Sequence, residues 1–230
     1  MLSRLTTALR RHGLAGTCRL LPTALAHQFD PRHRRRRASK LAFDRRYGTD
    51  TAEMVAVAAF GLPDHEARHM VHYEACDADQ TLAELETLDL PWPDYDFIDY
   101  GSGKGRQVLV AAGLPFRRVV GIERVADLHH IAQRNVELFR PHLRCGALEL
   151  RCGDARDYVP EPRPTVFFFY NPFDRGVLDP VMATIERACD PVLPRCVVLY
   201  ANPAHAARLE DSPRWRTVRR GPFWLVAFGR

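Results

Sequence analysis

The chain has 230 residues, of which 46% are hydrophobic and 27% are charged, and its formal net charge is +5. A chain of this length and apolar content can bury one substantial core and carry a small appendage. Its apolar runs fall short of the roughly 18 residues that a membrane-spanning helix needs. We therefore expect a globular protein with no transmembrane segment.

The positive charge is concentrated in residues 1–47, which hold twelve Lys and Arg residues against two Asp residues. We expect a basic N-terminal arm, with Leu2, Leu5 and Leu9 on one face of a helix, that could contact an anionic partner. The alternative is a compositional bias, because 31 of the 33 basic residues in the chain are Arg. We expect a bacterial cytoplasmic protein, with mitochondrial import of this acid-poor arm as the alternative.

Residues 48–90 form a lead-in that we expect to be mostly helical, with helices over 51–60 and 79–88. His65, His69 and His72 share one helical face and could ligate zinc if a fourth ligand approached. The alternative is that they are surface histidines. The six cysteines form no C-x-x-C pair, and we expect no metal site.

Residues 91–230 alternate between apolar strand patterns and helical patterns, which predicts an α/β core with a mainly parallel sheet. The chain ends in a pattern typical of a hairpin, 214–218 and 223–228 around a Gly-Pro turn. We expect the other strands near 96–100, 118–123, 147–152, 165–170 and 195–201, and helices near 104–113, 126–139 and 177–189.

A glycine-rich turn follows the first of these strands and opens a helix, an arrangement that places a nucleotide-like ligand at a helix N-terminus. Its glycines are Gly101, Gly103 and Gly105, whereas a dinucleotide fold needs its third glycine where this chain has Arg106. The carboxylate of Asp99 would repel a pyrophosphate and favour a ligand that carries an ammonium and a sulfonium.

Three later signals occur in the matching order. Glu123 ends the second strand, where an acid accepts ribose hydroxyls. Asp154 follows the third strand, and the dense apolar run 165–170 leads into Asn171. Over residues 73–230 these signals resemble the class I S-adenosylmethionine-dependent methyltransferases. The resemblance implies a Rossmann-like, seven-stranded, mostly parallel sheet with an antiparallel C-terminal hairpin strand, preceded by a helical N-terminal segment.

The resemblance also implies that S-adenosylmethionine is the cofactor, with Asp154 taking the adenine amino group and a tyrosine-containing loop lying over the ligand. The implied cofactor-binding residues are Tyr73, Asp99, Gly101, Ser102, Gly103, Gly105, Glu123, Asp154, Ala155 and Asn171. Lys104 and Arg106 could attract the methionine carboxylate of the ligand. The alternative is that both are solvated side chains at the edge of the loop.

For the methyl acceptor, the motifs are closest to the histone-lysine methyltransferases that lack a SET domain and to related bacterial and mitochondrial lysine methyltransferases. This resemblance implies a protein lysine or another amine as acceptor, oriented by Tyr170, Asn171, Pro172 and Phe173. Two alternatives remain open: a non-catalytic adaptor with a basic binding arm, and an NAD-dependent oxidoreductase.

Overall fold

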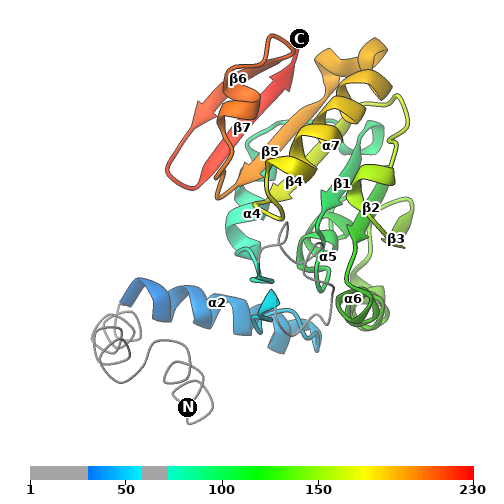
Figure 1. The fold of residues 1–230 in the computed structure, drawn as a ribbon. Coiled ribbons are helices and arrows are strands. Elements are labelled where there is room, and N and C mark those ends of the chain that lie inside the picture. The colour runs from blue at the N-terminus through cyan, green and yellow to red at the C-terminus, as the bar shows by residue number, and fades with distance from the viewer. Residues whose placement is uncertain (1–30, 58–71) are drawn as a thin grey trace, which may run out of the picture.

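A computed structural model describes residues 31–57 and 72–230, and in this part of the chain a single seven-stranded sheet organises the fold (Figure 1). The strand order is β3-β2-β1-β4-β5-β7-β6. The first five strands are parallel, and β7 pairs antiparallel with both β5 and β6. The strands are β1 (Asp96–Tyr100), β2 (Arg118–Glu123), β3 (Leu148–Cys152), β4 (Thr165–Tyr170), β5 (Val197–Ala201), β6 (Trp215–Arg220) and β7 (Trp224–Gly229). The predicted fold class and all seven strands are confirmed.

Helices lie on both faces of the sheet, as expected for parallel strands joined by crossovers. The predicted helices after β1, β2 and β4 are present, and so is the capped helix of the lead-in. The α-helices are α2 (Pro31–Tyr47), α4 (Ala78–Glu86), α5 (Arg106–Ala112), α6 (Ala126–Phe139), α7 (Arg175–Ala188) and α8 (Ala207–Glu210). Short 3-10 turns are η2 (Trp92–Asp94), η3 (Arg140–His142), η4 (Ala155–Asp157) and η5 (Asp190–Arg195).

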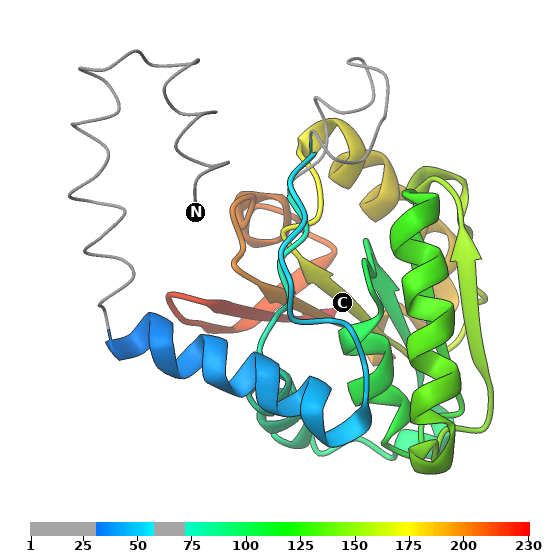
Figure 2. The same ribbon diagram turned by 90° about the horizontal axis from the view of Figure 1, so that it is seen from below.

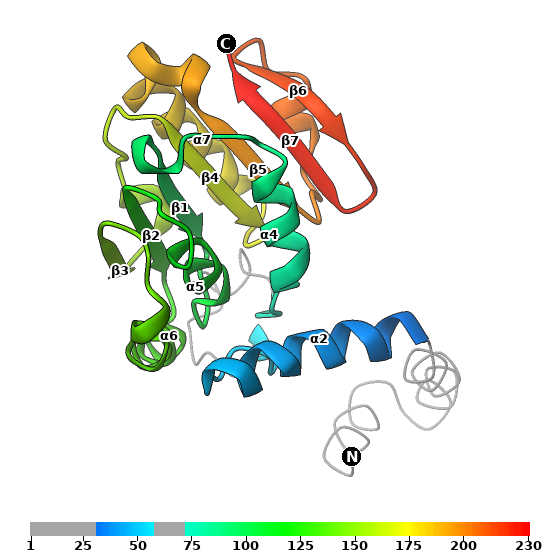
Figure 3. The ribbon, with the colours of Figure 1, turned by 180° about the vertical axis from the view of Figure 1, so that it is seen from behind.

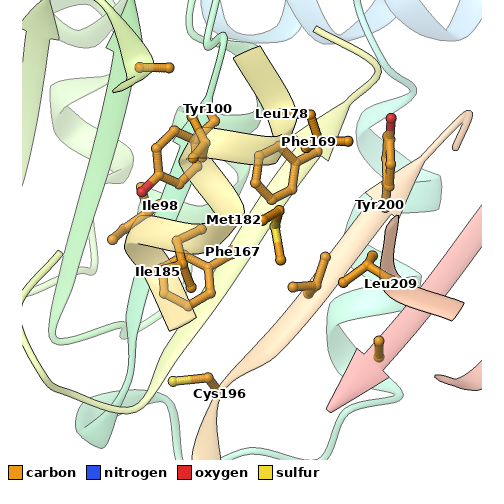
Figure 4. Close-up of a cluster of buried hydrophobic side chains, with 14 of the residues drawn as sticks. Ile98, Tyr100, Phe167, Phe169, Leu178, Met182, Ile185, Cys196, Tyr200 and Leu209 are labelled. Atoms are coloured by element: carbon orange, nitrogen blue, oxygen red, sulfur yellow. The ribbon is translucent and has the colours of Figure 1, made fainter. Parts of the chain in front are cut away.

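Two apolar layers hold the helices to the sheet. On one face, rings from β1, β4 and β5 pack against α7 and α8, with Tyr100 and Phe169 stacked at 5.2 Å between ring centroids (Figure 4). On the other face, Phe97 and Phe168 pack with the apolar residues of α4 and α5 (Figure 3). Because alternate residues of a strand point to opposite faces, β1 and β4 contribute to both layers. All of β1 is buried between them, and so is β4 up to Phe169.

The link from β3 to β4 passes over the positions of β2 and β1 with η4 as its one helical turn. This link comprises the twelve residues 153–164. The nine residues from 156 to 164 alone can extend about 30 Å, enough for a return of three strand spacings without a crossover helix. Because β3 and β4 are parallel, their carboxyl ends lie at the same edge of the sheet.

The prediction of a helix over 51–60 is wrong for residues 51–57, the part of it that the structure describes. Residues 51–57 contain no α-helix, and Val55 forms an antiparallel bridge with Tyr73, which Figure 2 shows as two segments running side by side. The backbone donors of this segment have other partners: Thr51 and Ala52 donate to Asp44, and Val55 donates to the carbonyl of Tyr73. Donors taken by these distant groups are not available to the first turn of a helix.

Helix α2 crosses the end of the molecule at which the parallel strands terminate (Figure 1). Its second half packs on the body, with the Tyr47 ring 4.7 Å from that of Phe139 and the Phe43 ring stacked on Phe139 at 6.3 Å. The run Arg34 to Arg37 belongs to the first half of this helix. Leu2, Leu5, Leu9, His65 and His69 lie outside the described residues. The proposed arm boundary at residue 47 is thus crossed by packing contacts.

The aromatic layer under α7 allows a test of what stabilises the core. Phe169 is fully buried, so Phe169→Ala should lower the free energy of unfolding by about 3 to 5 kcal/mol, as other large-to-small changes in packed cores do. Val159 is 64% exposed, and Val159→Ala should stay within about 0.5 kcal/mol of the parent. Urea denaturation measures both. Similar losses in the two variants would contradict the assignment of this layer as the core.

Candidate functional site

A cavity of about 340 Å³ opens at the carboxyl ends of the parallel strands, in the size range of small-ligand sites. The structure brings nearly all of the predicted site residues together in its wall. The lining includes Tyr73, Asp99, Gly101, Ser102, Gly103, Glu123, Asp154, Ala155, Tyr170, Asn171, Pro172 and Phe173. Gly105 is the one predicted residue that does not line it. Gly105 instead occupies the N-cap position of α5.

The glycine loop lets two other segments approach closely. A Cβ atom on Gly101 would lie 2.4 Å from the Cβ of Pro172, and one on Gly103 would lie 2.2 Å from the ring of Tyr73. Both glycines have φ in the left-handed region, at +78° and +54°, where other residues are strained. The loop therefore has glycine where the exit of β4 and the Tyr73 segment meet it.

Two carboxylates, Asp99 and Glu123, are buried in the cavity floor. Glu123 accepts hydrogen bonds from the backbone N–H groups of Gly103 and Val125, both at 2.7 Å. Burial raises the pKa of Glu123, and these two hydrogen bonds oppose that shift. Burial, with the neighbouring charge of Glu123, raises the pKa of Asp99 well above its ordinary value. This floor favours a ligand with positive charge or hydroxyl donors.

Asp154 is already engaged by two guanidinium groups. Its carboxylate accepts from the Arg156 side chain at 2.6 and 2.9 Å, from the Arg156 backbone N–H at 2.9 Å, and from Arg124. Hydrogen bonds from Arg156 are the main reason that the pKa of Asp154 is lowered. Its expected contact with an adenine amino group stays a prediction, and it would share the carboxylate with these two arginines.

Asn171 leaves β4 with φ of +40°, a left-handed conformation that asparagine tolerates better than most residues but that still costs energy. The buried hydroxyl of Tyr200 donates to Asn171 Oδ1 at 3.4 Å, and burial raises the pKa of Tyr200 to about 12. Held in this way, the Asn171 side chain lines the cavity beside Tyr170 and Phe173.

Tyr73 lies against the glycine loop, and its hydroxyl donates to the Thr51 carbonyl at 2.7 Å. Burial raises the pKa of this phenol, so it remains protonated and keeps its donor. Lys104 Nζ lies 5.8 Å from the centroid of the Tyr73 ring. Tyr73 thus links the cavity wall to the segment that follows α2.

Of the two alternatives for Lys104 and Arg106, the one in which both are solvated is wrong, because they are 3% and 2% exposed. Lys104 does not line the cavity, and its Nζ pairs with Asp50 at 2.9 Å. Arg106 lines the cavity, and burial lowers its pKa while Asp44 opposes the shift. Its Nη1 atom is buried and has no hydrogen-bond partner among the described residues, and the same is true of Oε1 of Gln107.

Several residues that line the cavity are not predicted from the sequence; they include Cys76, Gln107, Arg124, Leu128, Arg156 and Val177. Arg124 and Arg156 each lie within two positions of a predicted acid, and Gln107 follows the glycine loop directly, so adjacency to the motifs was the available signal. In residues 31–57 and 72–230 we find no cluster of three side chains suited to a metal ion. No helix of this part is long and apolar enough to cross a membrane.

The sequence matches no protein-family model and no curated protein. The fold, however, matches solved structures. A putative RNA methyltransferase from Pyrococcus horikoshii aligns over 76% of this chain and 97% of its own, with a TM-score of 0.52 and 12% identity. A ribosomal protein L11 methylase from Lactobacillus delbrueckii subsp. bulgaricus aligns over 68% and 80%, with a TM-score of 0.50 and 14% identity.

A putative methyltransferase from Escherichia coli aligns over 66% of this chain and 85% of its own, with a TM-score of 0.50 and 16% identity. At these identities the likeness concerns the fold. The chain has the Rossmann-like fold of these methyltransferases, with the cavity at the carboxyl edge of the sheet.

The raised pKa of Asp99 predicts how stability depends on pH. The folded protein holds this proton above the unfolded value of about 4, so the stabilising contribution is present at low pH and is lost as pH rises through the folded pKa. Asp99→Asn lacks this loss, and its stability relative to the parent should increase as pH rises above about 4. Urea denaturation from acid to neutral pH measures the difference, with exposed Asp211→Asn as control. A constant difference between Asp99→Asn and the parent would contradict the prediction.

Proposed function

We propose that this chain is an enzyme that transfers the methyl group of S-adenosylmethionine to an amine, a protein lysine first among the candidates. The observation that carries the proposal is the pair of buried carboxylates, Asp99 and Glu123, on the floor of one cavity. A sulfonium ligand with an ammonium group and a ribose diol satisfies both carboxylates, because it brings positive charge and hydroxyl donors.

The amino-acid end of such a ligand has further suitable partners. Arg106 Nη1 is a buried donor, and Gln107 Oε1 is a buried acceptor; neither has a partner among the described residues, and both residues line the cavity. A carboxylate and an ammonium on one carbon would satisfy them together, since buried polar groups left unpaired are costly. S-adenosylmethionine, the cofactor implied by the fold, therefore fits the residues that line the cavity.

S-adenosylmethionine supplies a methyl group already activated on a sulfonium, so the protein needs no nucleophile of its own. What the chain must do is align the acceptor and exclude water. Asn171 and the Pro172 carbonyl can orient an unprotonated amine by accepting its N–H donors. The faces of Tyr170 and Phe173 can stabilise the positive charge that develops on the nitrogen.

The oxidoreductase alternative is disfavoured by the same floor. A dinucleotide would place a pyrophosphate against the glycine loop, and the buried Asp99, which precedes this loop, lies in the cavity beside it. Like charges at close range in a buried site are strongly repulsive. Differential scanning with NAD and with S-adenosylhomocysteine distinguishes the two classes, and a non-catalytic adaptor would be stabilised by neither.

The acceptor class is open to direct measurement. The fold neighbours include one named for a ribosomal protein and one named for RNA, so fold likeness favours neither protein nor nucleic acid. Labelled methyl transfer from S-adenosylmethionine into a lysate, followed by separate digestion with protease and nuclease, identifies the acceptor. We expect label that protease releases and nuclease does not.

Cofactor affinity tests the role of Glu123. The carboxylate should accept charge-assisted hydrogen bonds from the ribose, worth about 1.5 to 3 kcal/mol. Glu123→Ala should therefore weaken binding of S-adenosylhomocysteine by roughly 10- to 150-fold in calorimetry. Glu149 is an acid on β3 that does not line the cavity, and Glu149→Ala should leave the affinity unchanged. An unchanged affinity in Glu123→Ala would remove Glu123 from the site.

The rate of methyl transfer tests the role of Asn171 at the exit of β4. Asn171→Ala should lower methyl transfer by about a hundredfold, as removal of one orienting polar group often does, and should affect S-adenosylhomocysteine binding far less. Asn202 is a matched control, because it follows β5 with a φ of +47° and precedes a proline but does not line the cavity. Full turnover in Asn171→Ala would show that Asn171 has no role in methyl transfer and that residues 171–173 serve only as a turn.

A further inference from the structure

Asp44 is the carboxylate at the centre of the contact between α2 and the body. Its Oδ1 accepts from the hydroxyls of Thr49 at 2.8 Å and Thr51 at 2.6 Å. Its Oδ2 accepts from the backbone N–H groups of Thr51 at 2.9 Å and Ala52 at 2.7 Å. The Asp44 side chain is 14% exposed. A single carboxylate therefore shapes the turn that follows α2.

This turn is joined to the glycine loop by several hydrogen bonds. Asp50 pairs with Lys104, and Asn135 accepts from the Asp50 backbone N–H at 2.8 Å while donating to the Asp50 and Lys104 carbonyls. The carbonyl of Thr51 accepts from the Tyr73 hydroxyl. Together these bonds join residues 50 and 51 to the loop, directly through Lys104 and indirectly through Asn135 and Tyr73.

Arg106 is the point at which this network reaches the cavity. Its Nε donates to the Thr51 hydroxyl at 2.7 Å, and its Nη2 donates to the Lys40 carbonyl at 2.7 Å and to Asp44 at 3.3 Å. The guanidinium also lies over the Phe43 ring, 4.8 Å from the centroid. A guanidinium is planar and rigid, so partners on Nε and Nη2 determine where Nη1 points.

We propose that Asp44 is a positioning residue of the cofactor site: through Thr51 and Arg106 it directs Arg106 Nη1 toward the carboxylate at the amino-acid end of the ligand. This inference rests on the proposed function. It makes part of the cofactor affinity depend on a helix that ends well before the glycine loop begins. Hydrogen-bonded chains of this kind hold a binding group in place because each member is satisfied only in one arrangement.

Two ligands separate positioning from general support of the fold. S-adenosylhomocysteine carries the amino-acid end, whereas 5′-methylthioadenosine keeps the adenosine and the thioether but lacks that end. Asp44→Asn should weaken S-adenosylhomocysteine by about tenfold in calorimetry, because the charge that holds Arg106 is lost, and should leave methylthioadenosine within about twofold. Equal losses for both ligands, or no loss for either, would overturn the inference.

Controls keep the two proposals apart. Glu53→Gln changes an exposed acid of the same segment and should leave both affinities at the parent value. If Asp44→Asn does not fold, Thr51→Val removes the hydroxyl between Asp44 and Arg106 and should show the same selective loss. A parent protein that binds neither ligand would contradict the proposed function itself. A parent that binds both, with variants that do not discriminate between them, contradicts the inference on Asp44 alone.

Arg106 supplies the last step of the test. Arg106→Gln should show the same selective loss of S-adenosylhomocysteine, and adding Asp44→Asn to it should cause little further loss, since the two residues act in one chain. Additive losses would show that Asp44 acts by another route, and would overturn the inference.

Discussion

The position of Glu123 is the constraint on which the candidate site depends. Its buried carboxylate receives one backbone N–H from the turn after β1 and one from the turn after β2. These two bonds tie the glycine loop to the neighbouring strand end, and they compensate part of the cost of burying a charge. Asp99 is left beside it with a raised pKa. The floor of the cavity is therefore held in a conformation that favours a positively charged ligand.

Much of this arrangement could be predicted from the sequence because it follows from strand order. The dense apolar run 165–170 is typical of a strand buried on both faces, and β4 is one. Once β1, β2 and β4 are known to be parallel neighbours, the residues after each strand must meet at one edge. Asp99, Glu123 and Asn171 are brought together for that reason, although they are far apart in the chain. Their chemical roles require ligand measurements.

Contacts between distant segments could not be predicted in the same way. The helical propensity of residues 51–57 is overridden by the Asp44 carboxylate and by the backbone bridge from Val55 to Tyr73. Propensity is a local quantity, and tertiary partners outweigh it. Arg106 and Lys104 show the same limitation, because their charged groups suggest solvent until the acids of the preceding segment are placed beside them. Asp44 lies 62 residues before Arg106, beyond any periodic pattern.

The two sides of the cavity therefore differ in how far they can be predicted from the sequence. One side of the cavity is formed by the ends of β1 and β2, whose order the fold dictates, and it carries the recognisable motifs that the proposed function assigns to the cofactor. The β4 exit, which the proposed function assigns to the acceptor, also lines the cavity, and residues 72–76 reach it beside the pairing of Tyr73 with Val55. Under the proposed function, selectivity for the acceptor should depend on the β4 exit and on residues 72–76, and the latter pair with a segment in which local sequence pattern predicts structure poorly.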